Sequence, residues 1–255
     1  MSDLFSDDEL LRYSRHILLP QIDIEGQQAL KNAHVLLVGA GGLGCPVGLY
    51  LAAAGVGRIS IVDADQVELS NLQRQIAHPM DHLGLNKAQS LQQALNRINP
   101  SVMVTVIAQW LNEENADALI SQADAVLDCC DNFATRYLVN RLCVKHKKAL
   151  VSGAAIRGEG QLVVLNHYDQ APCYSCLYPE GVDEGETCAQ AGVLAPLVGV
   201  IGSLQAVETL KYLTGTVPSK SLLTVYDAFS GQIRQMQLLK DQACAICATG
   251  TCEAE

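Results

Sequence analysis

A glycine-rich segment, Gly39-Ala40-Gly41-Gly42-Leu43-Gly44, lies between a short apolar stretch, His34 to Val38, and a longer apolar stretch typical of a helix. Its glycines follow the spacing G-x-G-x-x-G, in which missing side chains let main-chain N–H groups approach phosphates. Asp63 closes the next predicted strand, Arg58 to Val62, where a carboxylate can accept hydrogen bonds from ribose hydroxyls. These features predict a βαβ unit that binds a nucleotide. The alternative is a tight packing turn with a capping aspartate.

Helices and strands continue to alternate after this unit. We expect helices over residues 87–97, 113–121 and 134–146, and strands over 102–107, 125–128, 149–152 and 160–165. Such alternation produces a Rossmann-like, mostly parallel twisted sheet with helices on both faces. Two short helices separated by Pro20 precede it, so residues 1–32 form an N-terminal helical arm and 33–167 the nucleotide-binding part.

The segment 168–255 has a different character. Tyr168 to Gly192 contains proline, glycine, acids and three cysteines with little periodicity, which predicts a long crossover loop. An apolar helix over 195–213 and two strands over 222–226 and 232–238, paired as an antiparallel hairpin, should follow. We therefore expect a single α/β domain over 1–255 that ends in an antiparallel section and a cysteine-containing tail.

Charge and composition exclude several classes of protein. A formal net charge of −10 argues against a surface for nucleic acid or an anionic membrane. No apolar run reaches the roughly 18 residues of a membrane span, and the acidic first ten residues do not resemble a signal peptide. We expect a cytoplasmic protein whose ten cysteines serve metal binding or catalysis rather than disulfides.

A polar segment, Ser70-Asn71-Leu72-Gln73-Arg74-Gln75, follows the second strand of the βαβ unit, and Lys87 opens the next predicted helix. Two cations, Arg74 and Lys87, suit a triphosphate better than a nicotinamide ring. Either cation alone would be interpreted as a solvated surface charge. Together with the glycine loop, they favour ATP over a dinucleotide.

The segment Asp128-Cys129-Cys130-Asp131-Asn132 ends another apolar strand, at the carboxyl edge of the sheet where ligands of open α/β sheets bind. Asp131 can hold Mg²⁺, a hard ion that prefers oxygen ligands. The alternative is a cap for the following helix, which Asp131 or Asn132 can supply.

Four cysteines form two C-x-x-C pairs, Cys173 with Cys176 and Cys244 with Cys247, separated by 67 residues. Four thiolates suit a closed tetrahedral zinc site, which would join the crossover loop to the tail at one zinc per chain. Thioredoxin-like redox pairs are the rival interpretation, but they need a βαβ context that these loops lack.

Taken in order, these motifs resemble the ubiquitin-activating-enzyme-like adenylyltransferases of bacterial molybdopterin and thiamine biosynthesis, of the HesA, MoeB and ThiF types. The matching segments are Arg12 to Arg15, Gly39 to Gly44, Ser70 to Arg74, Asp128 to Asn132, Cys173 to Cys176, Ala191 to Val193 and Cys244 to Cys247. The resemblance implies that Mg-ATP is bound by Gly42, Asp63, Ser70, Asn71, Leu72, Gln73, Arg74, Lys87, Asp131 and Asn132. It also implies a homodimer in which Arg15 reaches the phosphates of the other protomer.

The resemblance further implies the reaction. ATP would adenylate the C-terminal glycine carboxylate of a small ubiquitin-like sulfur carrier that ends in Gly-Gly, and pyrophosphate would leave. Cys173 to Cys176 and Ser152 to Arg157 are nearer to the molybdopterin type and favour that carrier. Arg12 to Arg15 and Ala134 to Arg136 are equally typical of the thiamine type, so the sequence leaves both carriers open. Cys188 can form a covalent link to the carrier in this family, although nearby acids raise the pKa of such a thiol.

The chain ends eight residues after Cys247, so we expect a separate sulfur donor such as a cysteine desulfurase or a rhodanese. Two other classes remain open. A nicotinamide-dependent oxidoreductase would need a hydride-transfer pocket and a proton donor, neither of which the sequence indicates. A catalytically inactive scaffold would need loss of the cations or of Asp131, and all are present.

Overall fold

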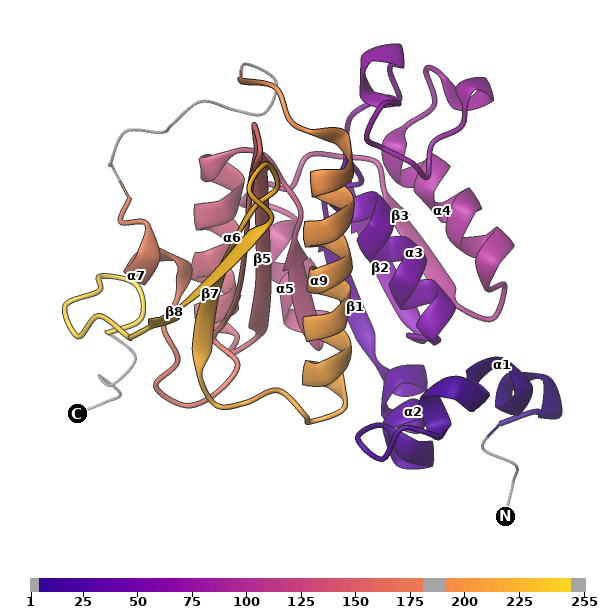
Figure 1. The fold of residues 1–255 in the computed structure, drawn as a ribbon, viewed down its shortest axis with the longest axis horizontal. Coiled ribbons are helices and arrows are strands. Elements are labelled where there is room, and N and C mark those ends of the chain that lie inside the picture. The colour runs from indigo at the N-terminus through magenta and orange to yellow at the C-terminus, as the bar shows by residue number, and fades with distance from the viewer. Residues whose placement is uncertain (1–4, 181–190, 249–255) are drawn as a thin grey trace.

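One eight-stranded sheet runs through the residues that the computed structural model describes, 5–180 and 191–248, in the order β3-β2-β1-β4-β5-β6-β7-β8 (Figure 1). The strands are β1 His34–Val38, β2 Arg58–Val62, β3 Met103–Ile107, β4 Ala125–Asp128, β5 Ala149–Ile156, β6 Glu159–Leu165, β7 Ser221–Asp227 and β8 Gln232–Leu238. Strands β1 to β5 pair in parallel, and β5 to β8 pair antiparallel. The expected Rossmann-like sheet with an antiparallel section is confirmed.

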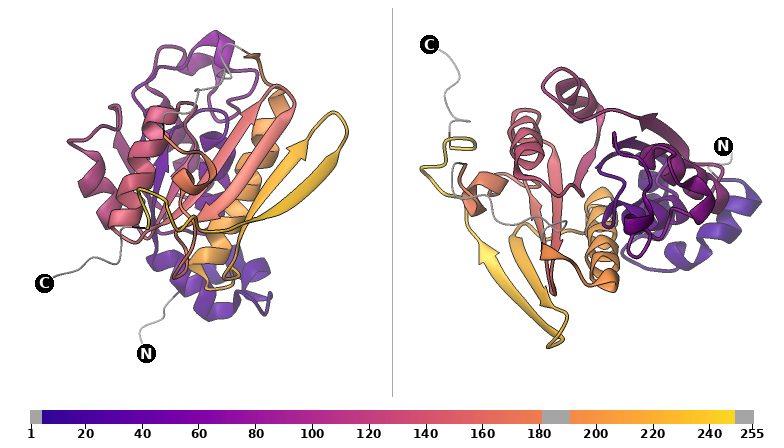
Figure 2. Two further views of the ribbon diagram at one scale, coloured as in Figure 1. Left: turned by 90° about the vertical axis from the view of Figure 1, so that its left-hand side faces the viewer. Right: turned by 90° about the horizontal axis from the view of Figure 1, so that it is seen from above.

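Helices cover both faces of this sheet (Figure 2). They are α1 Asp7–Ile17, α2 Asp23–Asn32, α3 Gly44–Ala54, α4 Lys87–Ile98, α5 Ala116–Gln122, α6 Phe133–Lys145, α7 Tyr174–Leu177 and α9 Ala195–Leu213, with 3-10 turns η1 Leu69–Asn71 and η2 Met80–His82. Successive side chains of β1 point to opposite faces of the sheet, so the core has two parts. Leu37 packs in the hydrophobic cluster beneath α3, α4 and α9, and Leu36 packs in the hydrophobic cluster beneath α5 and α6. No helix in the described part of the chain is long and apolar enough to cross a membrane.

Three elements differ by more than one residue from the sequence-based expectations. Helix α5 begins at Ala116 because the side chains of Asn112 and Asn115 bind main-chain N–H groups just before it. Strand β5 continues past Ser152 to Ile156, since its residues 150–156 pair with β6. The expected crossover loop contains the four-residue helix α7, and residues 181–190 of that loop lie outside the described residues.

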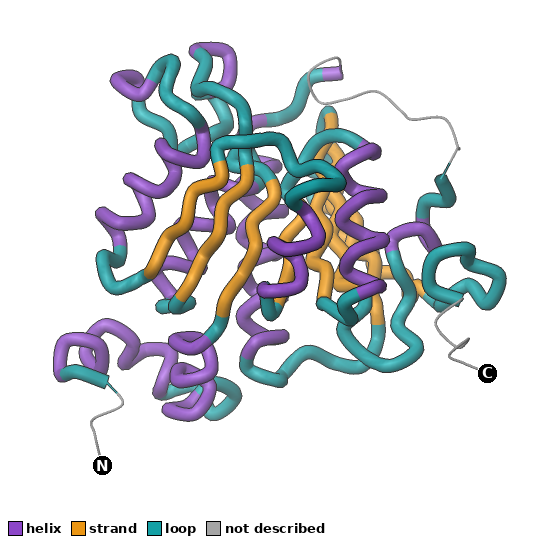
Figure 3. Tube along the Cα trace, turned by 180° about the vertical axis from the view of Figure 1, so that it is seen from behind, coloured by secondary structure: helices purple, strands orange, loops and turns teal. Residues whose placement is uncertain are grey.

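The N-terminal arm packs at the amino edge of the sheet, at the end opposite to the glycine loop (Figure 3). Tyr13 accepts a hydrogen bond from Asn99 Nδ2 at 2.8 Å. The Tyr13 ring packs closely against Gly55, where an added Cβ would lie 2.5 Å from a ring carbon. Arg12 donates to the carbonyl of Ile98 at 3.0 Å. These contacts join α1 to the residues that precede β2 and β3.

Candidate nucleotide-binding site and cysteine cluster

The glycine loop lies where the order of the parallel strands reverses, between β1 and β4. Ligands of open α/β sheets bind in the crevice at such a point. Gly39 has a φ of +97°, and a Cβ there would lie 2.8 Å from the Cys129 carbonyl oxygen. A Cβ on Gly44 would collide with the Gly39 carbonyl. Glycine at position 39 therefore lets the loop after β1 approach the loop after β4, and glycine at position 44 lets the glycine loop fold back on its own main chain.

Asp63 anchors the glycine loop as well as facing the pocket. Its Oδ2 accepts from the Ala40 N–H at 2.7 Å, and its Oδ1 accepts from the Asp65 N–H at 2.8 Å. Burial raises the pKa of Asp63, and these two main-chain donors oppose the rise. The carboxylate is therefore fixed in direction at the end of β2, the position expected for a group that binds ribose.

A pocket of about 460 Å³ opens above this crevice and brings together most of the residues selected from the sequence. Those that line it are Gly42, Asp63, Asn71, Arg74, Lys87, Asp131 and Asn132. Ser70, Leu72 and Gln73 are not among the lining residues; the carbonyl of Ser70 instead accepts from Arg74 Nη1 at 3.3 Å. Binding of nucleotide stays a prediction for these three residues and for those that line the pocket.

Lys87 is almost completely buried, and its ammonium lies 2.7 Å from Asp65 Oδ2. Asp65, which the sequence analysis did not select, also lines the pocket. Asn86 caps the helix that begins at Lys87 by accepting from the Gln89 N–H at 3.2 Å. The cation is thus placed at a helix N-terminus, beside the crevice.

Asn132, and not Asp131, caps the helix that follows. The sequence analysis had left the choice between these two residues open. Its Oδ1 accepts from the Thr135 N–H at 2.9 Å, at the start of α6. Asp131 is exposed at the pocket, and no hydrogen bond or ion pair to its carboxylate occurs among residues 5–180 and 191–248. Its oxygens are therefore available to a cation.

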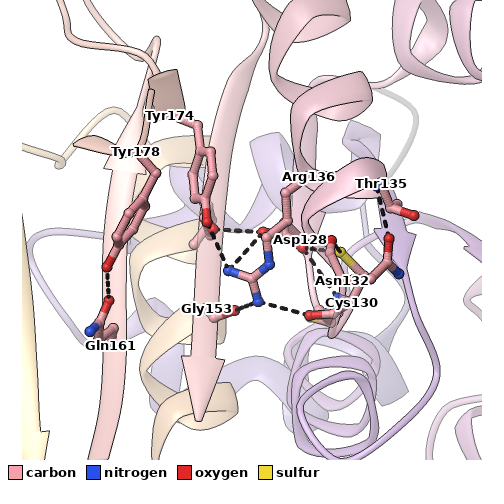
Figure 4. A network of polar contacts seen from close by, with 12 residues as sticks. Asp128, Cys130, Asn132, Thr135, Arg136, Gly153, Gln161, Tyr174 and Tyr178 are labelled. Atoms are coloured by element: carbon pink, nitrogen blue, oxygen red, sulfur yellow. Dashed lines mark hydrogen bonds and ion pairs between the residues drawn. The ribbon is translucent and has the colours of Figure 1, made fainter. Parts of the chain in front are cut away.

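A buried polar network forms the other wall of the pocket (Figure 4). Arg136 Nη2 donates to the carbonyls of Cys130 at 2.8 Å and Gly153 at 3.0 Å, and its guanidinium lies 3.7 Å from Asp128. Tyr174 contributes its hydroxyl 3.5 Å from Arg136. The sequence analysis missed Arg136 and Tyr174 as pocket residues, along with Tyr178 and Gln75. Arg136 and Tyr174 reach the pocket through tertiary contacts, so no local sequence pattern was available to identify them.

The four cysteines of the two C-x-x-C pairs lie together, with all sulfur atoms within 4.8 Å of one another. The Sγ distances are 3.6 Å from Cys173 to Cys244, 3.5 Å from Cys176 to Cys247 and 3.9 Å from Cys173 to Cys176. Tetrahedral zinc with bonds of 2.3 Å separates its sulfurs by about 3.8 Å. The donor set therefore fits a metal ion and joins α7 to the segment after β8.

Asn140 connects this cluster to the core. It is fully buried on α6, and its Nδ2 lies 3.6 Å from Cys173 Sγ and 3.0 Å from Ser175 Oγ. Its Oδ1 accepts from the Tyr174 N–H at 2.8 Å. The same side chain thus supports a cysteine of the cluster and the tyrosine that reaches the pocket wall.

Two further selected residues remain to be placed. Arg15 is exposed on α1, at the amino edge of the sheet, and does not line the pocket of its own chain. Cys188 lies outside the described residues.

The fold resembles solved structures of known proteins. Escherichia coli MccB, in a structure with MccA-N7isoASN, superposes with a TM-score of 0.80 at 22% sequence identity, covering 97% of this chain and 77% of that one. A structure of E. coli MccB with ATP gives a TM-score of 0.77 at 24% identity and covers 93% and 75% of the two chains. At this level of identity the likeness concerns the fold.

Comparison of sequences identifies relatives of higher identity. Molybdopterin-synthase adenylyltransferase of Escherichia coli K12 is 48% identical over 243 residues, which cover 95% of this chain and 98% of that protein. The adenylyltransferase and sulfurtransferase MOCS3 of Xenopus laevis is 47% identical, and this chain spans 54% of its length. The model of the ThiF family matches residues 13–247, which include the glycine loop, the pocket and all four clustered cysteines. The chain therefore belongs to the ThiF family and is an adenylyltransferase.

Proposed function

We propose that this protein adenylates the C-terminal glycine carboxylate of the small ubiquitin-like carrier of molybdopterin synthase, using ATP and releasing pyrophosphate. The observation that carries the proposal is the joint placement of Asp63, Arg74, Lys87 and Asp131 around one pocket at the strand reversal. High identity to molybdopterin-synthase adenylyltransferase along nearly the whole chain supports the choice of carrier. The whole of residues 1–255 would act as one adenylation domain.

The chemistry needs control of charge rather than a strong base. The carrier carboxylate is ionised at neutral pH, and it attacks the α-phosphorus while pyrophosphate leaves. Arg74 and Lys87 would offset repulsion between the carboxylate and the phosphates and stabilise the charge that develops in the transition state. By analogy with donors of oxyanion holes, each such cation would lower the barrier by about 2.7–4 kcal/mol.

The residues present also fit two metal ions. Asp131, exposed at the pocket without a protein partner in the described residues, would hold Mg²⁺, which supplies further charge for the phosphates. Cys173, Cys176, Cys244 and Cys247 would hold one structural zinc per chain, because four thiolates leave no coordination position for a substrate. Thiols that serve as zinc ligands stay reduced in a reducing compartment, which agrees with the proposed cytoplasmic location.

The catalytic unit would be a homodimer. Arg15 lies at the amino edge of the sheet, so it cannot complete the pocket of its own chain without leaving the contacts that α1 makes there. In the partner's pocket it would add a third cation to Arg74 and Lys87. A separate sulfur donor would then act on the adenylated carrier. Cys188 would be a candidate for a covalent link to the carrier.

Carrier-dependent ATP–pyrophosphate exchange tests the proposal. We expect exchange with the purified molybdopterin-synthase small subunit and none with a carrier that lacks its terminal glycine. Exchange with the thiamine carrier and not with the molybdopterin-synthase subunit would assign the protein to thiamine biosynthesis. No exchange with either carrier, from protein that binds ATP, would contradict the proposed reaction.

A further inference from the structure

Two histidines and a serine form a buried cluster behind the glycine loop. Ser90 is fully buried on α4, and His78 and His82 are at most 9% exposed. Ser90 Oγ lies 2.8 Å from the Nδ1 of each histidine, and Nε2 of His78 lies 2.8 Å from the carbonyl oxygen of Ala40. The cluster therefore joins α4 and the turn η2 to the glycine loop.

The partners of each atom fix where its hydrogens lie. The Ala40 carbonyl can only accept, so His78 Nε2 carries a hydrogen and donates it. Burial lowers the pKa of His78, so the ring is neutral near pH 7 and its Nδ1 accepts from the Ser90 hydroxyl. Ser90 Oγ in turn accepts from His82 Nδ1. The hydrogen bonds run in one direction, from His82 through Ser90 and His78 to Ala40.

Cys45 is a second donor to the same carbonyl. Its Sγ lies 3.6 Å from the Ala40 oxygen and 3.6 Å from His78 Nε2. Burial raises the pKa of Cys45 to about 12, so the thiol keeps its hydrogen. The carbonyl is thus held from the protein side by two groups, neither of which lines the pocket.

Holding this carbonyl fixes the direction of a donor on the other side of the loop. The Ala40 carbonyl and the Gly41 N–H belong to one planar trans peptide, so they point in opposite directions. Gly41 lines the pocket, and no acceptor in the described part of the chain takes the N–H of Gly41 or Gly42. The Ala40 N–H is already bound to Asp63. The Gly41 N–H is therefore presented to a ligand in the pocket.

We propose that His78 is a positioning residue for adenylation: held by Ser90 and His82, it fixes the Ala40–Gly41 peptide so that the Gly41 N–H meets a phosphate of the nucleotide. The proposal rests on the proposed function in needing a nucleotide in this pocket. It predicts that His78 contributes to the affinity for the phosphates of ATP and not to the affinity for the nucleoside.

The first test separates these two parts of the ligand. ATP affinity is measured by calorimetry and as the KM in ATP–pyrophosphate exchange, and adenosine is measured as a competitive inhibitor. We expect His78→Phe to weaken ATP about tenfold, the value of one lost hydrogen bond, and to leave adenosine inhibition unchanged. His78→Gln, whose amide can still donate toward the carbonyl, should recover most of the ATP affinity.

A milder pair of variants guards against loss of folding. Ser90→Ala removes the link between the histidines and should weaken ATP about threefold. Its matched control is Ser221→Ala, because Ser221 is also fully buried and donates to the Val164 carbonyl at 2.7 Å, away from the pocket. We expect the control to lose stability without a change in ATP affinity.

The outcomes distinguish the two proposals. Unchanged ATP affinity in Ser90→Ala and in folded His78→Phe would overturn the role of His78, as would an equal loss for ATP and adenosine. Wild-type protein that binds ATP but supports no exchange would contradict the proposed reaction instead, and calorimetry with ATP would still test His78.

Discussion

Arg136 and Asp128 form an ion pair of 3.7 Å beneath the pocket, where the Asp128 side chain is 1% exposed and the Arg136 side chain 10% exposed. Ser152 Oγ donates to the same carboxylate at 2.6 Å. Arg136 also binds the carbonyl of Cys130, so the pair fixes the segment that carries Asp131. A buried charge of either sign would be costly without the other.

Replacing this arginine should therefore destabilise the fold strongly. We expect Arg136→Met to lower the free energy of unfolding by about 3–5 kcal/mol, because it leaves the Asp128 carboxylate buried without a counter-charge. Arg141→Met is the control on the same helix. Arg141 pairs with Glu113 at 2.7 Å on the surface, so its loss should cost less than about 1 kcal/mol. Urea denaturation of both variants measures the difference, and equal losses would contradict the interpretation.

The cysteine cluster predicts one zinc per chain in freshly purified protein. Cys244→Ser should lose metal and stability together, because binding at a structural site contributes to the free energy of folding. Cys143→Ala is the control: Cys143 is also buried but lies outside the cluster, so this variant should lose stability and keep its metal. Elemental analysis and thermal denaturation check both expectations. Absence of zinc from unchelated wild-type protein would refute the assignment.

A substitution at Asn140 tests the zinc site without removing any of its four cysteine ligands. Because its Nδ2 contacts Cys173 Sγ, we expect Asn140→Ala to weaken zinc about 10–100-fold without removing a ligand. Competition with a chromogenic chelator measures that affinity.

The elements that the sequence predicted best are those with a clear apolar run and a clear end. β1 and β4 have the predicted bounds because each is a short apolar stretch. Helix α7 could not be predicted, since four residues show no periodicity and its position depends on Asn140 and on cysteines far along the chain.

The same distinction holds within the site. The glycine loop, Lys87 and Asp131 could be chosen because each follows a predicted strand or opens a predicted helix at the carboxyl edge. Arg136 and Tyr174 enter the pocket wall through tertiary contacts between α6, β5 and α7, which no local pattern encodes. His78 was passed over for the same reason, because its partners Ala40 and Ser90 lie 38 and 12 residues away.

Acid should weaken the fold through His78. Burial lowers its pKa in the folded chain, with smaller contributions from Lys87 and His82, whereas the unfolded chain takes up the proton near pH 6.5. Below about pH 6.5 the unfolded state therefore binds more protons, and the free energy of unfolding falls as pH drops toward the lower, folded pKa. The decrease between about pH 7.5 and 5.5 should be smaller in His78→Gln than in wild type. Equal decreases in urea denaturation would show that His78 does not titrate differently on folding.

Asp131 should be needed for catalysis and not for folding. Asn132 caps α6, so Asp131→Asn removes no helix cap and should leave the melting temperature unchanged. We expect this variant to lose nearly all ATP–pyrophosphate exchange, because the amide is a poor ligand for Mg²⁺ beside phosphates. Exchange with an unaltered dependence on Mg²⁺ would remove Asp131 from the metal site.

Arg15 provides the sharpest test of a shared active site. Its exposed position on α1, at the edge of the sheet away from the pocket, is compatible with action in a partner subunit. Arg15→Ala and Lys87→Ala homodimers should then both be nearly inactive in exchange. In a mixed dimer, one pocket carries both defects, while the other keeps its own Lys87 and receives Arg15 from the Lys87→Ala chain.

Mixing the two variants under conditions of subunit exchange should therefore restore activity, up to half of the wild-type value per mixed dimer. Differently tagged chains allow the mixed species to be isolated and its exchange rate measured directly. A double variant, Arg15→Ala with Lys87→Ala, mixed with wild type is the matched control, because there each pocket carries one defect and no activity should remain in the mixed dimer. If the mixed dimer of single variants forms and stays as inactive as its parents, Arg15 does not act across the dimer.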